Sequence, residues 1–564
     1  MRRGPLTPGE QIPVSDSQRQ RKQRGAFFTP PELSRHLVAW AVRTPSDKVL
    51  EPSCGEASFL IPAGERLQEL AGGRPVHGDQ LRGIELHEPS AARARELLAG
   101  AGLQGSVIAG DFFEFEAPGS YDAVVGNPPY VRYQSFTGEA RVRASERALR
   151  HGVRLTRLAS SWAPFVIHAS DFLKTDGRMA LVLPAELLTV NYAAEVRRFL
   201  LNRFGRIRLI LFEELVFPGV LEDVVLLLAE GMGPAPHFEV LQVRDAAALA
   251  SLDVEGWEQY QPDAEGKWTP ALLDDTAVDL YRELTNREEI SPLLAWGETS
   301  LGAVTGNNRY FSRTGEQVAA SGLPERDLVR ISPPGSRHLR GLTFTERAWQ
   351  ELVRAGAAGY LFYPRKNPLS KAAANYVAEG EAAGVHLAYK CRVRTPWYRV
   401  PLVQVPDLLL TYMDYERPRL VTNQARLRHL NSLYGVFLRR EVRQLGQDLL
   451  PMAAINSFTM LGAEMVGRAY GGGMLKLEPR EADKLPVPSP ELVNACATEL
   501  RALRPQLAKA LRQNNLAAAV KLVDRVILTK GMGLTHRDIQ VIRGAREFLF
   551  ARRATRGGGS GGKN

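Results

Sequence analysis

The chain has 564 residues, three of them cysteines, and a formal net charge of +10. Cys54, Cys391 and Cys496 are too few and too scattered for a disulfide framework or a zinc site, and no apolar run resembles a secretion signal or a membrane span. We therefore expect a cytoplasmic protein of several domains that uses no metal and contacts no membrane.

The charge is divided unevenly between the two halves of the chain. Residues 1–300 hold 32 Lys and Arg against 41 Asp and Glu, whereas residues 301–564 hold 40 against 21. A codon bias towards Arg would act on both halves alike and does not explain this contrast. The asymmetry predicts that the first half binds a small cofactor and the second half binds a polyanion such as DNA.

Strand-like and helical runs alternate from Lys48 onwards, after a polar arm at residues 1–24. This alternation is typical of a parallel α/β sheet, whose ligands bind at the carboxyl ends of its strands. Four strand-like runs lead into polar residues, and these are Glu51, Glu85, Asp111 and Asn127. Because carboxyl ends meet at one edge of such a sheet, the four residues predict a ligand site there.

The loop SCGEAS, which follows the first strand, contains a single glycine, Gly55. The pyrophosphate of a dinucleotide would need several close backbone N–H donors in this loop, so a dinucleotide is disfavoured. A nucleoside with a sulfonium amino-acid tail, S-adenosylmethionine, fits the loop better. An acid after the second strand, here Glu85, is the usual partner of ribose hydroxyls.

Asn127-Pro128-Pro129-Tyr130 follows the fourth strand and is the most informative motif. The amino group of adenine or cytosine is a weak nucleophile, because its lone pair is delocalised into the ring. An Asn amide oxygen and a carbonyl such as that of Pro128 can accept both amine hydrogens, and two prolines stiffen the loop that holds them. Tyr130 offers a flat face on which a base can stack. The motif predicts methylation of an exocyclic amine, and a simple tight turn is the alternative.

Five segments occur in the order GAFFTPPELSRHLVAWA, LEPSCGEASFL, GIEL, GDFF and NPPY, and together they resemble the gamma-class amino-methyltransferases of type II restriction–modification systems. The resemblance implies a class I, Rossmann-like methyltransferase domain that transfers a methyl group from S-adenosylmethionine to N6 of a flipped-out adenine in duplex DNA. It also implies a bacterial or archaeal protein, with a cognate restriction endonuclease or a defence-system component as a possible partner.

The same resemblance assigns residues to the cofactor. Thr29 and Pro30 would close over its methionine part, Glu51 would lie beside that part, Glu85 would bind the ribose, and Asp111 would contact the adenine amine. The complete expected set is Phe28, Thr29, Pro30, Glu51, Ser53, Gly55, Glu85, Asp111, Phe112 and Asn127.

The resemblance also names the catalytic residues, which would be Asn127, Pro128, Tyr130 and Phe217. The segment LVFPGVLEDVVLLLA resembles a hairpin whose Phe packs on the flipped base. By this resemblance Phe217 would form the second wall of a base sandwich opposite Tyr130; without it, Phe217 is more simply a core residue.

The basic half resembles the target-recognition domain of the same family, a mixed α+β domain. Arg and Lys interleaved with Tyr, Trp and Asn suit a DNA-facing surface, because cations neutralise phosphates while planar and amide side chains reach bases. The residues expected near DNA are Asn307, Asn308, Arg392, Arg394, Trp397, Arg419 and Asn423. The expected domains are an arm (1–24), a catalytic domain (25–245), an acidic connector (246–300), a target-recognition domain (301–490), a C-terminal helical region (491–554) and a linker-like tail (555–564).

Several alternatives remain open. Cytosine N4 presents the same amine as adenine N6, although enzymes of that type more often carry Ser at the position of Asn127. NPPY also occurs in compact enzymes that modify glutamine side chains or ribosomal RNA, but those lack an extension like residues 301–564. A non-catalytic specificity subunit would keep the fold and lose the chemistry. A fused nuclease is disfavoured, because the motifs begin by residue 25 and no nuclease cluster is evident.

Overall fold

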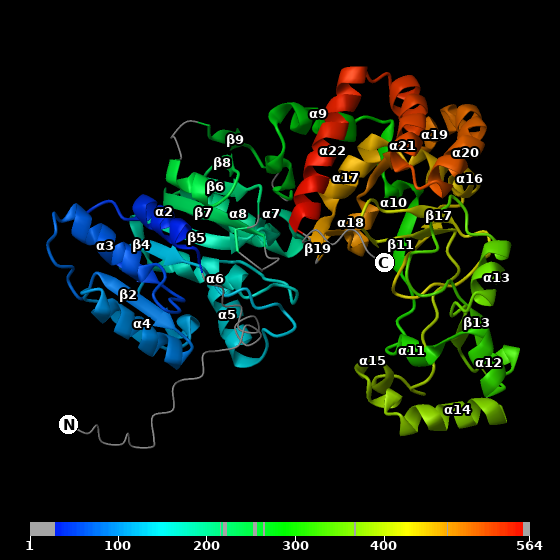
Figure 1. The fold of residues 1–564 in the computed structure, drawn as a ribbon, viewed down its shortest axis with the longest axis horizontal. Helices are drawn as coiled ribbons and strands as arrows, with labels where there is room; N and C mark the ends of the chain where they lie inside the picture. The colour runs from blue at the N-terminus through cyan, green and yellow to red at the C-terminus, as the bar shows by residue number, and fades with distance from the viewer. Residues whose placement is uncertain are drawn as a thin grey trace, which may run out of the picture. The chain divides into compact units, whose positions relative to one another are not determined.

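The computed structural model describes residues 29–214, 216–217, 223–251, 256–262, 266–365, 368–470 and 472–556. The chain divides into two compact units, Met1–Ala271 and Leu272–Asn564 (Figure 1). The border falls inside residues 246–300, where the sequence predicted a connector. The predicted arm at residues 1–24 and residues 557–564 of the predicted tail lie outside the described residues.

In the first unit, the described strands form one nine-stranded sheet of order β3-β2-β1-β4-β5-β7-β6-β8-β9. Strands β3, β2, β1, β4 and β5 are parallel neighbours, which confirms the predicted parallel sheet, whereas β7 runs antiparallel between β5 and β6. The strands are β1 (Val49–Glu51), β2 (Leu81–Glu85), β3 (Ser106–Ala109), β4 (Tyr121–Gly126), β5 (Leu173–Pro184), β6 (Phe204–Phe212), β7 (Val224–Met232), β8 (Phe238–Val243) and β9 (Glu258–Tyr260).

Helices cover this sheet and explain its apolar strands. On one face α2, α3 and α4 share a hydrophobic cluster with alternate residues of the central strand β4, among them Ala123 and Val125 (Figure 1). Because Val124, on the opposite face, is also fully buried, β4 has the continuous apolar pattern of a strand covered on both sides. The helices of this unit are α2 (Pro31–Ala41), α3 (Leu60–Leu70), α4 (Glu88–Gly100), α5 (Gly138–Arg150), α6 (Trp162–Ala169), α7 (Glu186–Thr189) and α8 (Ala194–Arg203).

The second unit combines small antiparallel sheets with helices, which agrees with a mixed α+β domain. Its described strands pair in the orders β10-β21, β11-β18-β15-β17, β12-β14-β13 and β16-β20-β19. Their bounds are β10 (Ile290–Pro292), β11 (Gly297–Leu301), β12 (Ser312–Arg313), β13 (Leu328–Arg330), β14 (Tyr360–Phe362), β15 (Leu408–Leu410), β16 (Met413–Asp414), β17 (Leu420–Thr422), β18 (Tyr434–Leu438), β19 (Arg468–Tyr470), β20 (Met474–Lys476) and β21 (Pro486–Pro488).

Helices gather towards the end of the second unit, as predicted for residues 491–554. Asp524 accepts hydrogen bonds from Ser457 and pairs with Arg543 at 2.7 Å, so one buried carboxylate joins α17, α21 and α22. The helices are α9 (Asp275–Thr285), α10 (Leu293–Trp296), α11 (Asn308–Phe311), α12 (Gly315–Ser321), α13 (Glu346–Arg354), α14 (Lys371–Ala382), α15 (Tyr389–Arg392), α16 (Arg443–Ala453), α17 (Ser457–Val466), α18 (Pro479–Asp483), α19 (Pro490–Ala495), α20 (Ala497–Arg512), α21 (Leu516–Asp524) and α22 (His536–Arg556).

Among the described residues, no single helix has the length and apolar composition needed to cross a membrane. By those two criteria alone, α16 and α17 would qualify only as a combined pair, which is bent by 92°.

Candidate active site

The acids predicted at the strand ends lie where the parallel strands of the first unit finish. Glu51 ends β1, Glu85 ends β2, and these two strands are paired side by side. Glu85 accepts hydrogen bonds from the backbone N–H of Gly55 at 2.9 Å and of His87 at 2.9 Å. The carboxylate therefore lies beside the loop after β1 and fixes it, and its role as a ribose ligand stays a prediction.

Glu51 is almost fully buried and holds the start of α3. Its carboxylate accepts hydrogen bonds from the backbone N–H of Leu60 at 2.8 Å and of Phe59 at 3.2 Å. Burial raises the pKa of Glu51 well above its ordinary value, and the nearby Glu85 raises it further, although the two backbone N–H groups oppose the shift. A cation bound beside Glu51 would favour the charged form of this carboxyl.

The loop between β1 and α3 takes an unusual backbone path. Gly55 has φ +52° and Ala57 has φ +66°, a left-handed conformation that is costly for alanine. Gly83 on β2 comes very close to this loop, because a Cβ there would lie 2.8 Å from Cys54 Sγ. The side chain of Ala57 is fully buried, so the surrounding packing holds the strained residue in place, as is common at ligand sites.

Asn127, which follows β4, forms a hydrogen bond with Thr29 at the beginning of the described residues. Its Nδ2 donates to Thr29 Oγ1 at 3.2 Å, although the two residues are 98 positions apart. The other amide atom, Asn127 Oδ1, is buried and accepts no hydrogen bond within the described part of the chain. A buried acceptor without a partner is costly, so Oδ1 is available to an N–H donor from a ligand.

The two carbonyls that flank Pro128 in the NPPY turn are both occupied. Ser53 Oγ donates to the Asn127 carbonyl at 3.2 Å, and Ser161 Oγ donates to the Pro129 carbonyl. No described residue donates to the Pro128 carbonyl between them. Asn127 Oδ1 and the Pro128 carbonyl are thus two acceptors of this turn that receive no hydrogen bond from the part of the chain that the structure describes.

Ser161, which the sequence analysis missed, acts as a clamp on this turn. Besides donating to Pro129, its hydroxyl accepts the Val131 N–H at 2.9 Å, and its own N–H donates to the Val131 carbonyl at 3.0 Å. The residue is 3% exposed and immediately precedes α6. No local pattern in the sequence links Ser161 to the motif about thirty positions earlier.

Tyr130 and Phe217, the predicted walls of a base sandwich, have different surroundings. Tyr130 is partly exposed, and its hydroxyl donates to the Val182 carbonyl on β5 at 3.0 Å, which fixes the direction of the ring. Phe217 is 2% exposed and belongs to the hydrophobic cluster of the sheet. Its role as a wall against a base stays a prediction.

Asp111 and Phe112 follow β3. Asp111 Oδ1 accepts the Phe113 N–H at 3.1 Å, while its Oδ2 pairs with Arg143 on α5 at 3.0 Å. Phe112 packs between aromatic rings, including Phe165 at a centroid distance of 4.7 Å. Arg143 was also missed from the sequence, because no local pattern links it to Asp111, 32 positions earlier. Of the remaining expected cofactor residues, Pro30 precedes α2, and Phe28 lies outside the described residues.

The residues expected near DNA fall into two groups in the second unit. Arg392 and Asn308 are exposed, although Asn308 also accepts a hydrogen bond from the Thr305 hydroxyl at 2.6 Å. The others make internal contacts: Arg394 donates to the carbonyls of Thr305 and Val304, Arg419 pairs with Asp414, Asn307 caps α11, Trp397 donates to Glu381, and Asn423 is buried with three backbone hydrogen bonds. For this second group, contact with DNA stays a prediction, and a structural role is directly visible.

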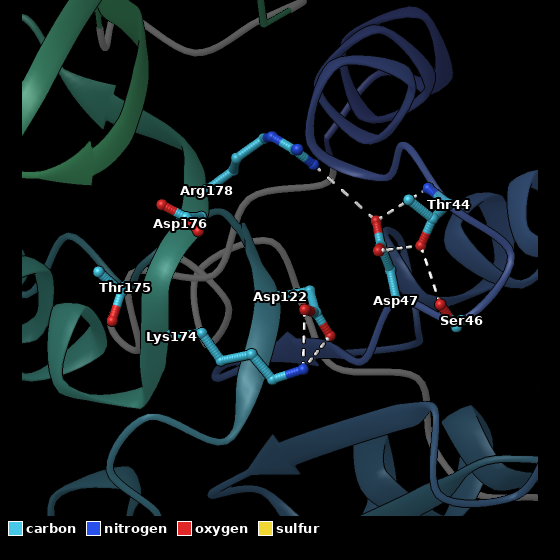
Figure 2. Close-up of a pocket in the computed structure, with 8 residues that line it drawn as sticks. All are labelled: Thr44, Ser46, Asp47, Asp122, Lys174, Thr175, Asp176 and Arg178. Carbon is cyan, nitrogen blue, oxygen red and sulfur yellow. Dashed lines mark hydrogen bonds and ion pairs between the residues drawn. The ribbon is translucent and has the colours of Figure 1, made fainter.

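A polar pocket of about 490 Å³ lies at the opposite edge of the sheet from the NPPY turn. Figure 2 shows that Lys174 pairs with Asp122 near the start of β4, while Thr44 and Arg178 reach towards Asp47. Its two cations, Lys174 and Arg178, thus pair with Asp122 and Asp47. The pocket takes no part in the site at the carboxyl ends.

The strand order and the polar strand ends define the class of the first unit, which has the α/β fold of the class I methyltransferases. The structure of the Type IIL restriction-modification enzyme MmeI in complex with DNA is similar in fold, with a TM-score of 0.53 and 11% identity over 95% of this chain and 80% of that chain.

Comparison with protein families then identifies the chain more closely. Residues 11–228 match the N-6 DNA Methylase family, and residues 265–528 match the C-terminal domain of the Type II methyltransferase M.Eco57I. Type II methyltransferase M.XamI from Xanthomonas campestris pv. amaranthicola is 24% identical over 84% of this chain and 86% of its own length. M.AccI from Acinetobacter calcoaceticus is 22% identical over 83% and 86%. The first part of the chain therefore matches an N-6 DNA Methylase, the second matches the M.Eco57I C-terminal domain, and the chain is similar over most of its length to type II methyltransferases.

Proposed function

We propose that the protein is a site-specific DNA methyltransferase that uses S-adenosylmethionine to methylate N6 of adenine, as the modification enzyme of a restriction–modification or related defence system. The observation that carries this proposal is a pair of acceptors, Asn127 Oδ1 and the Pro128 carbonyl, that have no donor among the described residues and lie on a turn held by Ser53 and Ser161.

The residues at the strand ends fit S-adenosylmethionine. The buried carboxylate of Glu51 suits its cationic methionine part, Glu85 suits two ribose hydroxyls, and Asp111 retains acceptor capacity for an adenine amine. Thr29 is held beside Asn127 by their hydrogen bond, which favours its predicted place over the methionine part. When bound, this cofactor supplies an electrophilic methyl group.

The protein's own contribution is to prepare the amine. Two acceptors facing the N–H hydrogens draw the nitrogen towards tetrahedral geometry and return its lone pair to the nitrogen. Because the acceptors sit on a stiff, hydrogen-bonded turn, little reorganisation is required as the amine becomes nucleophilic. The methylated amine is acidic enough to lose a proton to solvent, so a strong general base is unnecessary.

A base inside a duplex cannot reach this turn, so we infer that the target base leaves the stack. Flipping costs a few kcal/mol, and stacking on Tyr130 would return about 1–3 kcal/mol. Phe217 is the proposed second wall. It is 2% exposed, so stacking on a base would require a rearrangement around it.

Cytosine N4 is the second candidate target, because it offers the same amine to the same two acceptors. The two can be separated by incubating purified protein with unmodified duplex DNA and S-adenosylmethionine, and analysing the nucleosides by mass spectrometry. N6-methyladenine supports the proposal, whereas N4-methylcytosine supports the second candidate. An active wild type whose Asn127→Ala variant is equally active would refute the assigned role of the turn.

A further inference from the structure

The carboxylate of Asp111, which follows β3, is held by two different elements. Its Oδ1 accepts the backbone N–H of Phe113 at 3.1 Å, and its Oδ2 accepts both Nε and Nη2 of Arg143, at 3.3 and 3.0 Å. A carboxylate can accept about four hydrogen bonds, two on each oxygen. These contacts therefore occupy Oδ2 and leave Oδ1 with room for one further donor. The Asp111 side chain is 14% exposed, so a ligand can reach it.

Arg143 reaches Asp111 from α5, and another arginine of α5 holds this helix on the loop after β3. Arg147, which is 9% exposed, lies one turn further along the helix and donates its Nε to the Phe113 carbonyl at 2.8 Å. It also pairs with Glu116, and this hydrogen bond is the largest of the contacts that lower the pKa of Glu116 to about 2. The helix is thus anchored by contacts other than that of Arg143.

The contact between Arg143 and Asp111 affects the direction of the carboxylate more than the stability of the fold. The Arg143 side chain is 35% exposed and also lies 3.4 Å from Glu114 and 3.6 Å from Glu139. Ion pairs as exposed as these contribute little to the free energy of folding. An aspartate carboxylate has a broad range of χ2 angles, and two N–H groups on one oxygen restrict that range. Arg143 therefore helps to determine where Oδ1 of Asp111 points.

We propose that Arg143 is a positioning residue that lets the site select an adenine nucleoside, because by holding Oδ2 of Asp111 it presents Oδ1 to the exocyclic amine of the cofactor. The inference rests on the proposed function in taking S-adenosylmethionine as the cofactor, and it adds a residue outside the expected cofactor set. A fixed acceptor binds an amine and repels a carbonyl oxygen at the same place. A carboxylate free to turn could instead accept the N1–H of a hypoxanthine ring, so loss of Arg143 would weaken the selection.

The test compares two ligands on the full chain by isothermal titration calorimetry without DNA. S-adenosylhomocysteine carries the amine, S-inosylhomocysteine carries a carbonyl oxygen in its place, and neither has a methyl group to transfer. The wild type should bind the adenine ligand about 30-fold more tightly, the size expected for one hydrogen bond to a charged group. The readout is the ratio of the two dissociation constants, so a loss of folded protein lowers both signals alike and leaves the ratio unchanged.

Three variants test whether Arg143 acts through Asp111. Arg143→Met keeps the length of the side chain but removes its donors, so the ratio should fall to about threefold. Arg143→Lys keeps a charged donor and should restore a ratio of about tenfold. Asp111→Ala should bring the ratio to within about twofold of one, and adding Arg143→Met should change it no further, because the arginine then has no carboxylate to direct.

Arg206→Met is the matched control. Nε and Nη2 of Arg206 also converge on one carboxylate oxygen, Glu239 Oε1, at 3.2 and 2.8 Å, and the Glu239 side chain is 12% exposed. As with Asp111, a second group holds this carboxylate, here Arg208 at 2.6 Å. The pair joins β6 and β8, which are separated from β3 by several strands of the sheet. The ratio in Arg206→Met should therefore stay within about twofold of that of the wild type.

An equal fall of the ratio in Arg206→Met would overturn the proposal, as would a wild type that binds the two ligands equally well. A lower thermal midpoint of Arg143→Met with an unchanged ratio would leave only a structural role and would overturn it too. If all ratios are as expected but no methyl group is transferred to DNA, the proposed function alone is refuted. An active methyltransferase whose Arg143→Met variant keeps the wild-type ratio would refute this inference alone.

Discussion

Replacing Ser161 with alanine tests whether the NPPY turn must be held from outside. The hydroxyl of Ser161 donates to the Pro129 carbonyl and accepts the Val131 N–H at 2.9 Å, so Ser161→Ala leaves one acceptor and one donor without a partner. Each unsatisfied buried group costs about 1–3 kcal/mol. Because the groups are partly rather than fully buried, we expect a cost of about 2–3 kcal/mol in total.

The turn can recover part of this cost by shifting, and the shift moves the Pro128 carbonyl. A displacement of about 1 Å at a reacting centre lowers the rate roughly 100-fold. We therefore expect Ser161→Ala to lower the single-turnover rate constant of methyl transfer, and with it kcat, about 100-fold. The KM for S-adenosylmethionine in steady state should stay within about twofold, since within the described residues the Ser161 hydroxyl bonds to Pro129 and Val131 and not to an expected cofactor residue. Ser161→Thr keeps a hydroxyl and should recover most of the rate.

Ser170→Ala is the matched control. Ser170 is fully buried at the other end of α6, and its hydroxyl donates to the Ile167 carbonyl at 2.8 Å, so its loss lowers stability without touching the turn. If Ser170→Ala lowered kcat as much as Ser161→Ala, the effect would be one of stability and the positioning role would be refuted. Full activity of Ser161→Ala would refute it as well.

Three further predictions follow from the structure. Asn127→Ala should abolish methyl transfer but leave S-adenosylmethionine binding nearly intact in calorimetry. Loss of cofactor binding in this variant would contradict the assignment of Asn127 to the target amine. Because burial and the neighbouring acid raise the pKa of Glu51, the carboxylate that attracts a cation forms as the pH rises through that raised value, so cofactor affinity should increase with pH and then level off. Glu51→Gln should remove this dependence in the same titrations. Asp524→Asn leaves Arg543, which is 30% exposed, without its partner and should lower the free energy of unfolding of the second unit by about 2–3 kcal/mol in denaturant. Asp448→Asn breaks an ion pair whose side chains are about a third exposed, and it should lower the free energy of unfolding by less than about 1 kcal/mol. Equal losses in the two variants would contradict the role of burial.

The parallel part of the sheet could be predicted from the sequence because the signals that mark its strands are local. Each strand is a short apolar run, and each ends in a residue whose chemistry is recognisable, such as Glu85 or Asn127. The antiparallel insertion of β7 between β5 and β6 depends on long-range pairing that no local pattern encodes.

Side-chain roles in the second unit were harder to predict. Arg394, Arg419 and Asn423 are of residue types that suit DNA binding. In the structure, however, their side chains form hydrogen bonds or an ion pair with other groups of the protein. An Arg or Asn that holds a loop and one that binds a phosphate look alike in sequence, because the difference lies in which partner is nearby.

The most direct test of the central claim is long-read sequencing, with detection of base modification, of a plasmid from a methylation-free host that expresses this protein. We expect N6-methyladenine at one recurring short motif with the wild type, and none with Asn127→Ala. Modified cytosine at the motif would contradict adenine as the target. An unmodified plasmid in cells that contain the folded protein would contradict the claim that this chain alone methylates DNA.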